Sequence, residues 1–219
     1  MANNSNTTEN DVDNKKEALL SLWKEEHEYQ IKDGCASAVI KAILNVAKIG
    51  REITQEDIQD KVYTLPPWDG SKPEDVKGYL KEYFNDVDYL EEVDLQDVKK
   101  AIEDGKWVIV LWTDSLPESD RPEPEKYSSS EDGHYSILAF VDKKYVHLVD
   151  PSNSERVYTL DGVVLTKINP SENNVFIRRA IYKITIQEFE RRWHDIVDEN
   201  GRVANHPVII VDPNSVKKQ

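Results

Sequence analysis

The residue best suited to chemistry is Cys35, the single cysteine of this 219-residue chain. It begins a strongly apolar segment, Cys35 to Ile49, whose almost complete lack of a polar face predicts a helix buried on most sides. Gly34 directly before this segment and Gly50 directly after it mark the predicted ends of the helix. Because unsatisfied N–H groups and the helix dipole favour negative charge at a helix N-terminus, they stabilise a thiolate there. Cys35 is therefore a candidate nucleophile.

Two further side chains could assist such a nucleophile. Gln30 lies five residues before Cys35, and its amide could donate, with the Cys35 backbone N–H, to an oxyanion that forms beside the sulfur. Of the five histidines, only His134 has a favourable context, because it opens the predicted strand Tyr135 to Val141. We expect His134 to exchange protons with the sulfur and with a leaving group.

A carboxylate that orients His134 is predicted from the strand pairing. A tight turn over residues 142 to 144 folds the strand Tyr145 to Val149 back antiparallel to the preceding strand. Counting outward from this turn places Asp150 within about two positions of the point opposite His134. A carboxylate there would hold the imidazole in the required tautomer and stabilise its cation.

The order of these residues resembles that of the bacteriocin-processing (double-glycine leader) peptidases, a family of papain-like cysteine peptidases. The resemblance rests on Gln30-Ile-Lys-Asp-Gly-Cys35-Ala-Ser-Ala, on Gly133-His134-Tyr-Ser-Ile-Leu and on Val149-Asp150-Pro151, and it spans roughly residues 25 to 165. It implies that Cys35 attacks, that His134 is base and then acid, that Asp150 orients His134 and that Gln30 helps to form the oxyanion hole. Many members have glycine where this chain has Ala36.

The elements that must position these residues follow an α+β pattern, in which helices come first and an antiparallel sheet second. We expect a papain-like fold with the N-terminal nucleophile helix packed on the C-terminal sheet. Residues 1–14 are predicted to be a disordered polar tail and residues 15–219 a single peptidase domain. Besides the segments above, helices are predicted at Lys15–Glu28, Thr54–Lys61, Ser71–Phe84, Leu95–Glu103 and Ile186–Val197, and strands at Trp107–Trp112, Arg156–Leu160, Val175–Lys183 and Val208–Val211.

Composition narrows the classes of partner. The formal net charge of −14, from 42 acidic and 28 basic residues, disfavours nucleic acid and anionic lipid as ligands. We expect a peptide or protein substrate that is neutral or cationic, and neither a metal nor an organic cofactor. One cysteine allows no internal disulfide, and the sequence has neither a signal-peptide pattern nor an apolar run that could span a membrane. A cytoplasmic, soluble protein is expected.

Other features receive less specific interpretations. The segment Asp114 to Gly133 is acidic and proline-containing, and we consider it a candidate mobile lid that selects against anionic substrates. His27, between glutamates, is expected on a solvated helix face, and His194 and His206 are expected to be structural or exposed.

The sequence thus predicts a cysteine peptidase or amide hydrolase that works through a thioester. Two alternatives stay open at this point. The acyl group could be passed to an amine or thiol, as in a peptide ligase, or the chain could be a pseudo-peptidase that binds a peptide without cleaving it.

Overall fold

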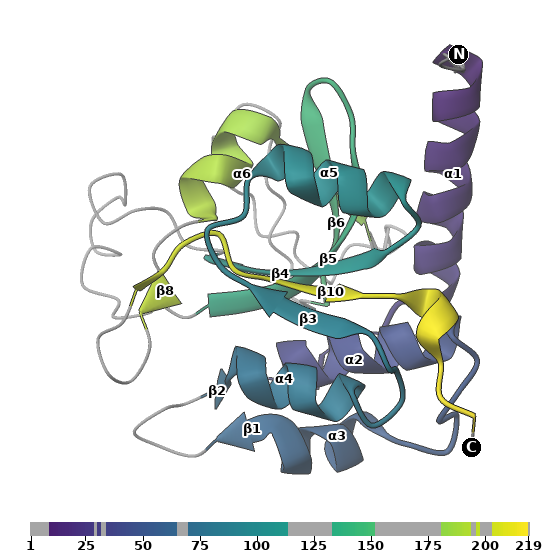
Figure 1. Ribbon diagram of the computed structural model, residues 1–219, viewed down its shortest axis with the longest axis vertical. Coiled ribbons are helices and arrows are strands. Elements are labelled where there is room, and N and C mark those ends of the chain that lie inside the picture. Colours follow the sequence, from purple (N-terminus) through teal and green to yellow (C-terminus); the bar gives the residue numbers. More distant parts are fainter. Residues whose placement is uncertain are drawn as a thin grey trace, which may run out of the picture.

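The computed structural model describes residues 9–28, 30–31, 34–64, 70–113, 133–151, 181–193, 196–197 and 203–218. Within these residues, helices cover both faces of an antiparallel sheet (Figure 1), which confirms the α+β class. The main described sheet has the strand order β3 (Val87–Leu90), β10 (Val208–Val211), β4 (Trp107–Thr113), β5 (Gly133–Val141), β6 (Tyr145–Val149) and β7 (Ile181–Thr185).

The helix that begins with the cysteine, α2 (Cys35–Val46), packs on one face of this sheet, as predicted. Neighbouring residues of a strand point to opposite faces. Ile109 and Ile137 therefore join Ile40 of α2 in one core cluster, whereas Val110 and Leu138 belong to a second cluster on the other face. Figure 1 shows α2 and α4 on one side of the sheet and α5 and α6 on the other.

The turn between β5 and β6 is fixed by Asp142. Its carboxylate accepts hydrogen bonds from the backbone N–H groups of Lys144 and Tyr145, at 2.9 and 2.7 Å. From this turn the two strands pair so that Ile137 lies opposite Val149. Extending this register by one step places Asp150 opposite Ser136, two positions from His134, as the sequence-based count predicted.

The first helix, α1 (Glu9–Glu26), begins six residues before the predicted start at Lys15. Residues 9–14 are therefore helical, residues 1–8 lie outside the described part of the chain, and the proposed domain boundary stays a prediction. Within the described residues, no helix is both long and apolar enough to cross a membrane.

Three short helices follow the nucleophile helix largely as predicted: α3 (Gln55–Val62), α4 (Pro73–Leu80) and α5 (Leu95–Glu103). The capping box of α3 is confirmed, because the Asp57 N–H donates to the Thr54 hydroxyl at 3.1 Å and the Asp57 carboxylate accepts from the Thr54 N–H at 2.9 Å. Pro73 stands in the first turn of α4. The predicted end of α4 at Phe84 was four residues too late.

The predicted helix Ile186–Val197 was wrong in its second half. The helix α6 (Ile186–Arg192) ends before Trp193, and the short strand β8 (Ile196–Val197) pairs with β9 (Val203–Ala204). Branched side chains at 196 and 197 favour a strand, and Asn200-Gly201 is a hairpin signal in the sequence.

The sequence analysis also missed β3 and the short strands β1 (Tyr63–Thr64) and β2 (Gly70–Ser71). β3 is too short to give a clear pattern of alternation, and it is held by β10, which enters the sheet between β3 and β4. The predicted strand Arg156–Leu160, most of Val175–Lys183 and the candidate lid up to residue 132 lie outside the described residues.

Candidate active site

The turn into α2 leaves no room for a side chain beside the cysteine. A Cβ atom on Gly34 would lie 2.6 Å from the Ser37 hydroxyl oxygen and 2.9 Å from the Ile31 carbonyl oxygen. The Gly34 φ angle of −87° is open to any residue, so glycine is required here for space and not for its backbone freedom. The Ser37 hydroxyl donates to the Gly34 carbonyl at 2.9 Å, which satisfies this acceptor within the first turn.

His134 lies at the start of β5 and contacts both of its predicted partners. Its Nε2 atom is 2.7 Å from Oδ1 of Asp150, and the two side chains are only 10% and 15% exposed. The same ring also interacts with Cys35, which is half-buried at the start of α2, closely enough for the cysteine to raise the His134 pKa. Because Nε2 faces Asp150, Nδ1 is the ring nitrogen left for Cys35. The structure thus brings Cys35, His134 and Asp150 together in this order.

The surroundings of His134 favour its charged form. Burial alone would lower its pKa, but the charge of Asp150, the hydrogen bond that the ring donates to that carboxylate and the interaction with Cys35 together raise the pKa well above its usual value. An imidazolium in this place can stabilise a thiolate beside it and later deliver a proton.

Two aromatic residues that the sequence analysis did not single out border the cluster. Trp112 of β4 lies opposite His134 in the register, its ring meets the imidazole edge-on at 6.1 Å, and its Nε1–H donates to the Ser136 hydroxyl at 3.0 Å. Tyr135 donates its hydroxyl to the Ser71 carbonyl at 2.9 Å. Burial and the nearby charge of Cys35 raise the pKa of Tyr135, so it stays neutral. Both side chains are buried.

Gln30 lies beside the end of β6. Its backbone N–H donates to the carbonyl of Pro151 at 2.8 Å, and Pro151 directly follows Asp150. The backbone of Gln30 is therefore fixed at the same end of the sheet as the His134–Asp150 pair. Its participation in an oxyanion hole stays a prediction.

His27 is not on a solvated helix face, and this prediction was wrong. The helix α1 ends at Glu26, so His27 leaves the helix surface and becomes half-buried. Its Nε2 atom lies 2.8 Å from the backbone carbonyl oxygen of Asp150. The glutamates on both sides of His27 suggested exposure, and no signal in the sequence indicated a contact between positions 27 and 150.

The other histidines lie away from Cys35 or outside the described residues. His147 is buried and forms a 2.9 Å hydrogen bond with Asp142 at the β5–β6 turn. The ring of His206 stacks on Trp193 at 4.7 Å, in agreement with a structural role. His194 lies outside the described residues. Among the described ranges, no group of three or more His, Cys, Asp or Glu side chains is arranged to hold a metal ion.

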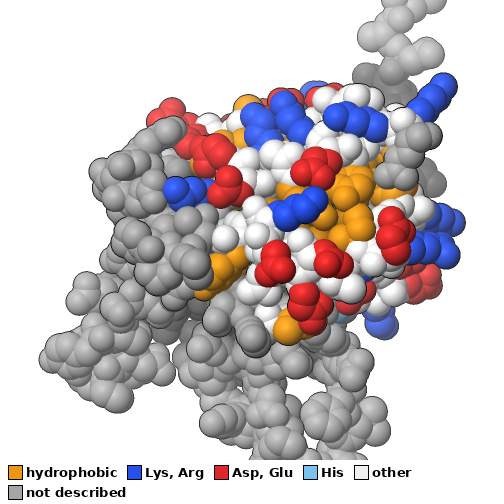
Figure 2. Space-filling model, turned by 90° about the horizontal axis from the view of Figure 1, so that it is seen from below, with side chains coloured by type: hydrophobic (Ala, Val, Ile, Leu, Met, Phe, Trp, Pro, Cys, Tyr) orange, Lys and Arg blue, Asp and Glu red, His pale blue; other side chains and the backbone are white. Residues whose placement is uncertain are grey.

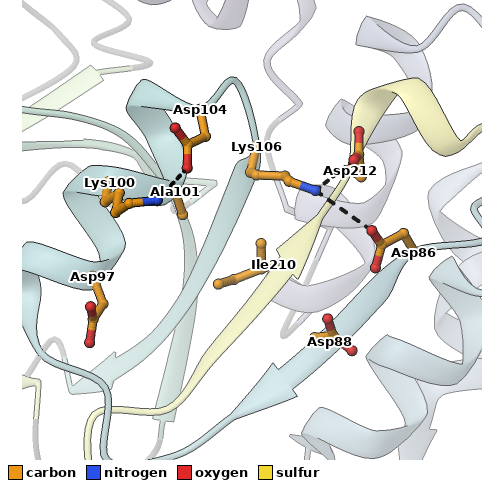
Figure 3. A pocket seen from close by; sticks show the side chains of 9 residues that line it. All are labelled: Asp86, Asp88, Asp97, Lys100, Ala101, Asp104, Lys106, Ile210 and Asp212. Atoms are coloured by element: carbon orange, nitrogen blue, oxygen red, sulfur yellow. Dashed lines mark hydrogen bonds and ion pairs between the residues drawn. The ribbon is translucent and has the colours of Figure 1, made fainter. Parts of the chain in front are cut away.

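A separate cavity of about 320 Å³ lies between α5 and the strands β3 and β10 (Figure 3). It is lined by acidic side chains and two lysines, of which Lys100 pairs with Asp104 and Lys106 with Asp212 and Asp86. An acidic cluster of this kind does not by itself identify a ligand.

Seen from the side of α3 and β1, charged side chains of both signs surround an area of hydrophobic surface (Figure 2).

Comparison with known proteins adds a distant structural likeness. No family model matches the sequence, and no curated protein is significantly similar to it. Among solved structures, one from Bacillus anthracis, described provisionally as a C39-like peptidase, superposes with a TM-score of 0.49 and 13% identity over 88% of this chain and 94% of that one. These values are too low to assign an activity to the present chain.

Proposed function

We propose that this protein is a cysteine peptidase or amide hydrolase in which Cys35, His134 and Asp150 form a catalytic triad and Gln30 contributes to the oxyanion hole. The observation that carries the proposal is the double contact of His134, to the Asp150 carboxylate at 2.7 Å and to Cys35. Buried histidines with one acidic partner also serve structural roles, as His147 does here. His134 differs from His147 because its other ring nitrogen faces a cysteine at the start of a helix, and acyl transfer requires a nucleophile placed beside a base in this way.

In the proposed reaction, the Cys35 thiolate attacks the carbonyl carbon of a peptide or amide bond. The oxyanion that forms accepts hydrogen bonds from the Cys35 backbone N–H and the Gln30 amide. The His134 imidazolium gives its Nδ1 proton to the leaving amine, and a thioester with Cys35 forms. His134 then removes a proton from water, which attacks the thioester and releases the acid. Asp150 holds Nε2–H throughout, so that Nδ1 keeps facing the sulfur.

The family resemblance supports the same roles, since the predicted residues occur in the expected order along the chain. We also propose that the substrate is a neutral or cationic peptide, because the net charge of −14 repels anionic ones. Hydrolysis is the simplest fate of the thioester. Transfer to an amine would need only a second binding site for the acceptor.

The proposal can be tested with a mixed peptide library and detection of products by mass spectrometry. We expect cleavage products whose formation stops in Cys35→Ser, which keeps the size of the side chain but loses the thiolate. His147→Ala is the matched control, because it removes a histidine–carboxylate pair away from Cys35. New peptide junctions would indicate a ligase. Peptide binding without products and without a reactive thiol would contradict catalysis and favour a pseudo-peptidase.

A further inference from the structure

The segment between α1 and α2, called here the connecting strap, runs beside both halves of the proposed site. Its described residues are His27, Glu28, Gln30, Ile31 and Gly34. The backbone N–H of Gln30 reaches the carbonyl of Pro151 at 2.8 Å. The strap is therefore bound to the end of β6, immediately after the residue that orients His134.

The strap is bound on its other side to the helices behind Cys35. The Glu28 carboxylate accepts hydrogen bonds from the side-chain amides of Asn45 in α2, at 2.9 Å, and of Gln55 in α3, at 3.3 Å. Two helices thus hold the strap in place, and a contact from the strap to β6 can transmit this rigidity to the site.

His27 provides such a contact. Its Nε2 atom lies 2.8 Å from the carbonyl oxygen of Asp150, while the carboxylate of the same residue lies 2.7 Å from His134. A carbonyl oxygen can only accept a hydrogen bond, so Nε2 of His27 carries the proton. Asp150 therefore contacts two histidines: its backbone carbonyl accepts a hydrogen bond from His27, and its carboxylate pairs with His134.

We infer that His27 is a positioning residue, which fixes the backbone of Asp150 and thereby the orientation of His134 toward Cys35. This inference rests on the proposed function. The described hydrogen bond of His27 goes to the Asp150 backbone and not to Cys35. Its effect is indirect, since a carboxylate displaced by a fraction of an ångström would hold the imidazole less well.

The protonation of His27 agrees with this role. Burial lowers its pKa, against the opposing influence of the Asp150 hydrogen bond and of the Asp150 and Glu28 charges. The ring is therefore neutral at pH 7 and donates through Nε2. A neutral donor adds no positive charge that would compete with His134 for the Asp150 carboxylate.

The test measures the rate of Cys35 alkylation by iodoacetamide from about pH 5 to 9 in the wild type, His27→Ala and His27→Gln. Loss of one hydrogen bond should slow alkylation of His27→Ala near pH 6 by about five- to tenfold. The glutamine variant should recover most of the rate, because its amide can place an N–H near the position of Nε2. His147→Ala, which loses a comparable 2.9 Å hydrogen bond, should keep the wild-type profile.

Three results would overturn the inference: a wild-type profile in His27→Ala, equal slowing in His27→Ala and His147→Ala, or no recovery in His27→Gln. Should His27→Ala fail to fold, ring ¹⁵N shifts of the wild type decide, because the inference requires the Nε2–H tautomer and the Nδ1–H tautomer contradicts it. A wild-type cysteine that reacts like a free thiol would overturn both proposals. A reactive cysteine that does not depend on position 27 would overturn only this one.

Discussion

Replacement of Gly34 by alanine should disturb the nucleophile more than a single methyl group would suggest. The added Cβ would lie 2.6 Å from the Ser37 hydroxyl, 2.9 Å from the Ile31 carbonyl and 3.1 Å from Oε1 of Gln59. The serine can rotate away only by giving up its hydrogen bond to the Gly34 carbonyl. The Ile31 oxygen belongs to the backbone and can yield only if the connecting strap moves.

The magnitude follows from these contacts. Overpacking of this kind costs about 1–3 kcal/mol, and the lost hydrogen bond of Ser37 adds about 1 kcal/mol. Alanine also lowers the conformational entropy of the unfolded chain, which offsets about 0.4–1 kcal/mol of this loss of stability. We therefore expect Gly34→Ala to lower the free energy of unfolding by about 1–3 kcal/mol and to slow alkylation of Cys35 even where the protein is fully folded.

The assay combines urea denaturation with alkylation below the unfolding transition. Gly78→Ala is the matched control, because this glycine is exposed within α4 and a Cβ there would meet no atom within 4 Å. We expect the control to gain about 0.5–1 kcal/mol, since alanine loses less backbone entropy in a helix. Equal stability changes in the two variants, or wild-type alkylation in folded Gly34→Ala, would refute the reasoning.

Three further predictions follow. Asp142→Ala should lower the free energy of unfolding by about 2–4 kcal/mol in urea denaturation, because the carboxylate accepts four hydrogen bonds, while Cys35 keeps its reactivity. Burial alone would raise the pKa of Asp142, but these hydrogen bonds lower it. The stabilisation that Asp142 contributes is therefore fully present above the unfolded-state pKa of about 3.9 and should be lost as the pH falls below that value. Unfolding of the alanine variant should lack this pH dependence. Because the pKa of His134 is raised, kcat/KM of the wild type should stay high through neutral pH and fall only as the pH rises through the His134 pKa. Asp150→Ala should lower kcat/KM about 100-fold and move this fall at alkaline pH to a lower pH. An alkaline fall at the same pH in both proteins would contradict the role of Asp150.

Much of the site geometry could be predicted from local sequence. The apolar run after Cys35 defined the nucleophile helix, and the tight turn at Asp142 set the register that carries Asp150 toward His134. Both inferences depend on interactions between residues close in the chain, where periodicity and turn chemistry decide the structure. The same holds for the capping box at Thr54.

Contacts between distant segments could not be predicted in this way. His27 and Asp150 are 123 positions apart, and a histidine among glutamates is typical of an exposed surface. β10 enters the sheet between β3 and β4, although nothing in its apolar sequence specifies these neighbours. The need for glycine at position 34 arises from the packing of Ser37 and the connecting strap, which appears only once the chain is folded.

The central claim is that Cys35 and His134 form a reactive ion pair, and alkylation of this single cysteine by iodoacetamide across the pH range tests it most directly. In the wild type we predict rapid reaction well below the range in which a free cysteine thiol ionises, about pH 8.5, and loss of this low-pH reactivity in His134→Ala but not in His147→Ala. A cysteine that reacts only near pH 8.5, or that reacts alike with and without His134, would contradict the account.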